Sequence, residues 1–163
     1  MQDLNFNPYK STSDFRKNYK LHDLAETAGK NLLTQWGFEF HDFGKDNRYK
    51  KVWEKGKDKP DIIISYKNKK ALLDWKAKHK SKWLINERAY NSYKEWEKIL
   101  LLPVIISFFV FDEKKEIADM RFACLSSHKH KASSEKEWDK NQTIEFENAL
   151  PLFSKPALIK FLA

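Results

Sequence analysis

Two carboxylates and one ammonium group are spaced so that a β-hairpin would bring them together. The segment 59–78 reads KPDIIISYKNKKALLDWKAK, with apolar runs on either side of a polar turn at 67–70. Short apolar runs bounded by turn residues are typical of buried strands. Because side chains alternate along a strand, Asp74 and Lys76 share a face, and antiparallel pairing would bring Asp61 near Asp74. Clustered carboxylates repel each other unless a cation lies between them, and their oxygens favour Mg²⁺ or Mn²⁺.

The same residues resemble a known catalytic motif. Pro60-Asp61 and Asp74-Trp75-Lys76, with twelve residues between the two aspartates, resemble the core of the PD-(D/E)xK nuclease superfamily. The resemblance implies that Asp61, Asp74 and the carbonyl of Trp75 hold a divalent metal ion. It also implies that Lys76 orients or deprotonates the attacking water and contacts the phosphate. A hairpin whose ends carry ordinary solvated charges is the alternative interpretation.

A helix before the hairpin is predicted to complete the site. Residues 13–36 carry apolar side chains at three- and four-residue steps, which is typical of an amphipathic helix. Ser13 is a candidate N-cap, and Gly37 is suited to end the helix in the left-handed conformation. In the nuclease superfamily an acidic residue on the first helix often joins the metal ligands. By this resemblance Glu26 is the candidate, with Asp23 as a substitute, and a solvent-facing role for Glu26 is the alternative.

The remaining elements follow in the order that the resemblance implies. An alternating strand at 38–41 precedes the hairpin, a helix at 83–102 follows it, and a continuously apolar strand spans 104–111. Pro103 separates the last two elements. This order matches the αβββαβ core of the superfamily, an α/β (α+β) fold with a central mixed sheet flanked by helices. We expect this restriction-endonuclease-like core to cover residues 13–125.

The rest of the chain is predicted to extend this core within a single domain of 163 residues. Residues 1–12 are interpreted as a flexible arm, and residues 126–163 as C-terminal additions. These additions comprise a polar loop at 126–142, an edge strand at 143–146 and a final helix capped by Ser154.

Basic charge is concentrated around the hairpin. Between residues 45 and 82 there are 14 Lys plus Arg against 5 Asp plus Glu, whereas the remaining chain has 17 against 18. Localised positive charge indicates a polyanionic partner such as nucleic acid, with a solvated lysine-rich surface as the alternative. The residues expected to contact nucleic acid are Lys59, Lys78, Lys80, Lys82, Asn86 and Tyr90. The last two occupy the place of a Gln-x-x-x-Tyr pair in some nuclease subfamilies, and packing or capping is their alternative role.

Composition narrows the class of protein. The single cysteine, Cys124, excludes an internal disulfide and is typical of a reducing, intracellular compartment, which we take to be the cytoplasm. No apolar run is long enough to span a bilayer, and the first ten residues lack the apolar stretch of a secretion signal. His128 and His130 are interpreted as part of a solvated loop, because a zinc site needs further converging ligands.

These patterns predict a Mg²⁺- or Mn²⁺-dependent DNA endonuclease. The chain has little room for a separate sequence-recognition domain, so we expect a structure-selective or weakly specific enzyme similar to Holliday-junction resolvases. Such an enzyme would be a homodimer with two sites. A non-catalytic nucleic-acid-binding module and a nuclease subunit of a larger assembly are the other classes that stay open. RNA is an alternative substrate, because lysines directed at phosphates do not distinguish the sugars.

Overall fold

The computed structural model describes residues 12–43, 58–128, 130–136, 142–147 and 149–163 of the chain, which are built from three helices and eight strands. In chain order they are α1 (Thr12–Gln35), β1 (Glu39–Asp42), β2 (Ile62–Tyr66), β3 (Lys69–Lys78), β4 (Leu84–Asn86), α3 (Glu87–Leu100), β5 (Val104–Phe111), β6 (Ile117–Cys124), β7 (His130–Lys136), β8 (Gln142–Phe146) and α4 (Lys155–Leu162). The predicted arm and most of the loop before Pro60 lie outside the described residues.

The strands form two sheets. The larger sheet has the order β1-β2-β3-β5-β6, and the smaller one has the order β4-β8-β7. Only the β3–β5 pair of the larger sheet is parallel, so this sheet is mixed. A parallel pair needs a crossover connection, and α3 provides it between β3 and β5.

The predicted hairpin is present, with a shorter turn than expected. β3 begins at Lys69, which leaves Lys67 and Asn68 as a two-residue turn with φ values of 48° and 70°. Positive φ at both central positions defines a type I′ turn, whose twist matches that of the paired strands. The resulting register pairs Ile62 with Leu73, and the predicted convergence of the two aspartates follows from it.

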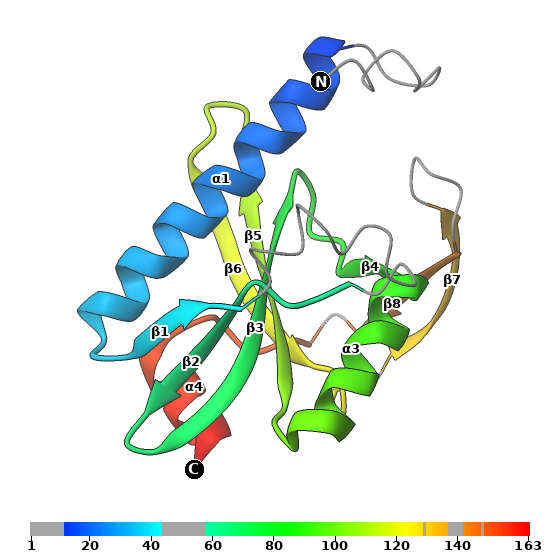
Figure 1. Ribbon diagram of the computed structural model, residues 1–163. Helices are drawn as coiled ribbons and strands as arrows, with labels where there is room; N and C mark the ends of the chain where they lie inside the picture. The colour runs from blue at the N-terminus through cyan, green and yellow to red at the C-terminus, as the bar shows by residue number, and fades with distance from the viewer. Residues whose placement is uncertain (1–11, 44–57, 129, 137–141, 148) are drawn as a thin grey trace.

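Helices cover both faces of the larger sheet (Figure 1). On one face, Leu33 of α1 and Leu158 of α4 pack in the same buried cluster as Trp75 of β3. On the other face, Tyr93 of α3 packs in a cluster with Leu72 and with residues of the smaller sheet. β5 is buried along its whole length between these layers, as its continuous apolar sequence predicts.

The helix boundaries differ from the prediction at their N-terminal ends. α1 already includes Thr12, so Ser13 is not its N-cap, whereas Gly37 has the predicted positive φ of 86°. The helix predicted from residue 83 is wrong at its start, because residues 84–86 pair with β8 as strand β4. Asn86 then caps α3, which ends at Leu100.

The C-terminal part contains more sheet than the sequence predicted. The predicted loop at 126–142 is wrong in part, because residues 130–136 form β7. The strand predicted at 143–146 is present as β8, but it lies between β4 and β7 and is therefore not an edge strand. Ser154 caps α4 as predicted, accepting a hydrogen bond from the Ala157 N–H at 3.3 Å. Among the described residues, no helix combines the length and apolar character needed to cross a bilayer.

Candidate active site

The two aspartates meet where β2 ends alongside β3. Pairing between these strands stops at Ile62 and Leu73, and the Asp61 N–H donates to the Leu73 carbonyl at 3.0 Å. The Asp61 carboxylate then takes the place of a further strand residue, because its Oδ2 accepts a 2.9 Å hydrogen bond from the Trp75 N–H. These two hydrogen bonds hold Asp61 against the edge of β3, just beyond the last paired residues of β2.

The carbonyl of Trp75 points toward the same edge. In a strand, the N–H and C=O of one residue face the same neighbour, so the Trp75 carbonyl lies on the side of Asp61. The backbone carbonyl of Asp74 faces the opposite side of the strand. It accepts a 3.0 Å hydrogen bond from the buried Ser107 hydroxyl of β5. The backbone of β3 thus offers one carbonyl oxygen beside the two carboxylates.

Asp74 is buried and forms an ion pair with Lys76. Its side chain is 5% exposed, and its Oδ2 lies 3.1 Å from the Nζ of Lys76. This contact lacks hydrogen-bond geometry, so within the described parts of the chain Oδ2 is a buried acceptor without a hydrogen bond. An oxygen in this state can accept a further ligand, such as a cation or a water molecule.

The electrostatics of Asp74 and Lys76 reflect this burial. Desolvation raises the pKa of Asp74 to about 7, with the charge of Asp61 adding to the rise and Lys76 opposing it. Burial acts to lower the pKa of Lys76, but the charges of Asp74 and Asp61 outweigh it and raise the pKa above its usual value. Lys76 therefore stays an ammonium at neutral pH, while Asp74 holds a proton in part of the molecules.

Asp61 behaves in the opposite way. Burial acts to raise its pKa, but the neighbouring His22 and the hydrogen bond from the Trp75 N–H outweigh burial and lower the pKa below its usual value. The two neighbouring carboxylates thus differ in charge at neutral pH, one ionised and one partly protonated. A divalent cation placed between them would allow both to ionise.

The sequence interpretation missed His22, which α1 places directly against Asp61. The His22 Nε2 lies 3.8 Å from the Asp61 Oδ2, an ion-pair distance, and the interaction with Asp61 is the main cause that raises the pKa of His22. His22 lies four residues before Glu26, on the same side of α1. That spacing was the available signal, but the family resemblance directed attention to an acidic residue.

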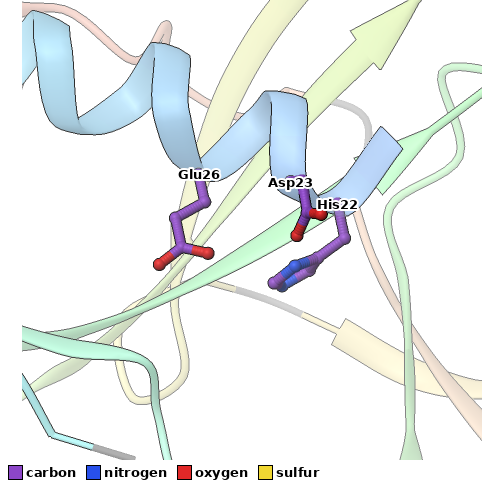
Figure 2. A group of neighbouring side chains, drawn as sticks. All are labelled: His22, Asp23 and Glu26. Carbon is purple, nitrogen blue, oxygen red and sulfur yellow. The ribbon is translucent and has the colours of Figure 1, made fainter. Parts of the chain in front are cut away.

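Glu26 and Asp23 lie beside His22. One ligand atom from each of these three residues lies within 4.8 Å of the others, and Figure 2 shows the three side chains projecting from α1. Glu26 also forms an ion pair with Lys30 at 2.8 Å, and Lys30 reaches Asp42 of β1 at 3.3 Å. Of the three, His22 has the contact with Asp61, so the role predicted for Glu26 stays a prediction.

Two residues predicted to contact nucleic acid have contacts within the protein. The Asn86 side chain accepts a 2.8 Å hydrogen bond from the Arg88 N–H, which is the capping role considered as its alternative. Tyr90 packs against His130, with their ring centroids 4.8 Å apart. Tyr93 of α3 is buried near Asp74, and desolvation and then the charge of Asp74 raise its pKa.

The predicted lysines lie on the chain segments that flank the two aspartates. The Nζ of Lys78 lies 5.9 Å from the Phe108 ring centroid, on the same face of β3 as Asp74. Lys80 and Lys82 follow in an exposed segment after β3. The Nζ of Lys59 lies 5.5 Å from the ring centroid of Trp96 on α3, which is a cation–π contact. Their contacts with nucleic acid stay predictions.

The donor set fits a hard divalent cation. Asp61, Asp74 and the Trp75 carbonyl supply oxygen atoms at one edge of β3, and His22 adds an imidazole beside them. Oxygen-rich sets of this kind favour Mg²⁺ or Mn²⁺ over zinc.

Comparison with known proteins gives a likeness of fold. No protein-family model matches the chain, and no curated protein matches its sequence. Among solved structures, the chain is similar to Hjc, a Holliday junction resolvase from the archaeal hyperthermophile Archaeoglobus fulgidus, with a TM-score of 0.50. The two are 13% identical, and the match covers 76% of this chain and 83% of the resolvase. The predicted fold class is confirmed: this is a restriction-endonuclease-like α/β fold with a central mixed sheet flanked by helices.

Proposed function

We propose that the protein is a divalent-metal-dependent DNA endonuclease that hydrolyses phosphodiester bonds. One observation carries the proposal: the buried carboxylate of Asp74 lies against the Lys76 ammonium at the point where Asp61 also converges. A structural ion pair needs one carboxylate, whereas here a second carboxylate, Asp61, lies close enough to raise the pKa of Asp74. The fold shared with an archaeal resolvase supports a nuclease, and the basic charge around the hairpin supports a nucleic-acid substrate.

Asp61, Asp74 and the Trp75 carbonyl would hold the metal ion, with His22 as the contribution from α1 and Glu26 as the alternative. When bound, Mg²⁺ or Mn²⁺ supplies positive charge at the scissile phosphate and lowers the pKa of an attacking water. The Trp75 N–H keeps the Asp61 carboxylate in a fixed orientation, so no reorganisation is needed on binding.

Lys76 has the role of a charged donor in this proposal. Its pKa is raised, because the charges of Asp74 and Asp61 outweigh the effect of burial, so it carries a proton at neutral pH. A protonated ammonium can donate to a phosphate oxygen and orient the attacking water, and it stabilises the negative charge that develops in the transition state. Lys78, Lys80 and Lys82 would hold flanking phosphates, which positions the nucleic acid without reading its sequence.

We further propose that the substrate is a branched or otherwise structured DNA. The lysines proposed to bind DNA would contact phosphates, which carry no sequence information. Hjc, which has a similar fold, is described as a Holliday junction resolvase. Symmetric cleavage of a four-way junction needs two sites, so a homodimer belongs to this proposal. Size-exclusion chromatography with light scattering tests it, and a monomer at micromolar concentration in the presence of junction DNA would contradict it.

The cleavage experiment uses labelled four-way, flap, duplex and single-stranded DNA, and RNA, with Mg²⁺, with Mn²⁺ or with excess chelator. We expect cleavage by the wild type only with metal, and a loss of at least about 100-fold in the Asp74→Asn and Lys76→Met variants. Lys67→Met is the matched control, because Lys67 is an exposed lysine of the β2–β3 turn. Full activity in chelator would contradict the proposal. Binding without cleavage of any substrate would support a non-catalytic module instead.

A further inference from the structure

Gly29 allows α1 to pack unusually close to β3. A Cβ atom at this position would lie 2.1 Å from Cζ3 and 2.3 Å from Cη2 of the Trp75 indole. The indole cannot move aside easily, because it is fully buried and packs against Phe109 and Phe153 at centroid distances of 5.8 and 6.1 Å. Any side chain at position 29 must therefore push the helix away from the sheet.

Glycine at position 29 does not stabilise the helix. Gly29 lies in the second half of a 24-residue helix, where glycine is a poorer helix former than alanine. Its position is explained by the close contact with Trp75. What that contact sets is the distance between α1 and β3.

The same distance determines how His22 meets Asp61. Seven residues separate His22 from Gly29, which is nearly two turns, so both face the sheet from the same side of α1. Trp75 contacts both Gly29 and Asp61. Its indole touches Gly29, and its backbone N–H holds the Asp61 carboxylate that lies 3.8 Å from His22.

We infer that Gly29 is a positioning residue of the site, whose contact with the Trp75 indole sets the separation between His22 and Asp61. An alanine at position 29 needs a displacement of about 1.3 Å to bring the 2.1 Å approach to an ordinary contact of 3.4 Å. A rigid helix transmits this displacement to His22, two turns away, and breaks its contact with Asp61. The consequence for metal binding rests on the proposed function, whereas the contact itself does not.

The contact is measured directly from the imidazole ¹⁵N chemical shifts of His22 at fixed pH, without metal or DNA. In the wild type, Asp61→Asn should shift the His22 resonances. In the Gly29→Ala background the same change should leave them unmoved. Asn31→Ala is the matched control, because Asn31 is exposed on α1, and in that background the response to Asp61→Asn should be retained.

A second variant tests rescue. Trp75→Phe removes the far atoms of the indole that meet the added Cβ, and within the described residues the indole Nε1 has no hydrogen bond to lose. The double variant Gly29→Ala/Trp75→Phe should restore the response of His22 to Asp61→Asn. It should also restore Mn²⁺ affinity, measured by titration calorimetry, from a loss of about tenfold or more in Gly29→Ala to near the Trp75→Phe value.

Retention of the His22 response in Gly29→Ala would overturn the inference, and so would a folded double variant that lacks it. If Gly29→Ala does not fold, the double variant alone decides between these outcomes. Absence of Mn²⁺ binding by the wild type would instead contradict the proposed function, because the His22 resonances report the contact without any metal.

Discussion

Replacement of Asp74 by asparagine tests the electrostatic character of the site. The change keeps the shape of a side chain that is 5% exposed and removes its negative charge. Lys76 loses its partner, but its side chain is 31% exposed, so water can solvate the ammonium. The variant should therefore fold, and the free energy of unfolding should depend on pH differently in the two proteins.

The size of this pH-dependent difference in the free energy of unfolding follows from the raised pKa of Asp74. Burial, assisted by the charge of Asp61 and opposed by Lys76, raises the pKa of Asp74 from 3.8 to about 7 in the folded state. Below pH 3.8 the carboxyl is protonated in both states. As the pH rises toward 7, it ionises in the unfolded state first, which lowers the stability of the wild type. Between pH 4.5 and 8 the wild type should lose about 3 kcal/mol relative to the variant.

The assay is chemical denaturation of both proteins from pH 4.5 to 8.5 in the presence of chelator, followed by tryptophan fluorescence. From pH 4.5 to pH 8 the difference in the free energy of unfolding should change by about 3 kcal/mol in favour of the variant. Saturating Mg²⁺ should reduce this advantage, because the cation stabilises the wild-type carboxylates. A stability difference that does not change with pH would refute the buried, partly protonated state of Asp74.

Three further predictions follow from the site. Mg²⁺ at about 100 times its dissociation constant should stabilise the wild type by about 3 kcal/mol, and Asp61→Asn should abolish the shift in a thermal melt; an equal shift in that variant would exclude Asp61 as a ligand. Asn86→Ala should cost about 1 kcal/mol in denaturant unfolding through loss of the α3 cap, with little change in DNA affinity, and a large affinity loss would restore its predicted binding role. Replacing Lys78, Lys80 and Lys82 by glutamine should lower the slope of log affinity against log salt by about 2–3 in fluorescence anisotropy titrations, whereas an unchanged slope would place the phosphates elsewhere.

The hairpin and its carboxylates were predictable because their determinants are local. Apolar runs identified both strands, and the polar segment between them located the turn, although the observed two-residue turn sets a register that the predicted four-residue turn did not give. Once Ile62 pairs with Leu73, Asp61 and Asp74 must meet at the end of β2. The buried strand at Val104–Phe111 was equally clear, because eight consecutive apolar or small residues suit only a strand covered on both faces.

The errors concern segments whose structure depends on distant partners. Leu84 and Ile85 fit a helical stripe, but they form a three-residue strand because β8, nearly sixty residues later, pairs with them. His130 begins a strand that the polar sequence did not indicate, since the partner of β7 in the described part of the chain is β8. Strands this short carry little periodicity, so tertiary pairing overrides local preference.

The sequence by itself determined that two carboxylates and one lysine share the end of a hairpin, because strand alternation and register are properties of neighbouring residues. Tertiary structure decided which residue of α1 joins them. Helical periodicity leaves His22 and Glu26 on similar faces, and only the close approach of Gly29 to Trp75 fixes how α1 sits on β3. The burial that leaves an oxygen of Asp74 without a hydrogen bond was likewise decided by packing, because desolvation depends on every layer around the sheet.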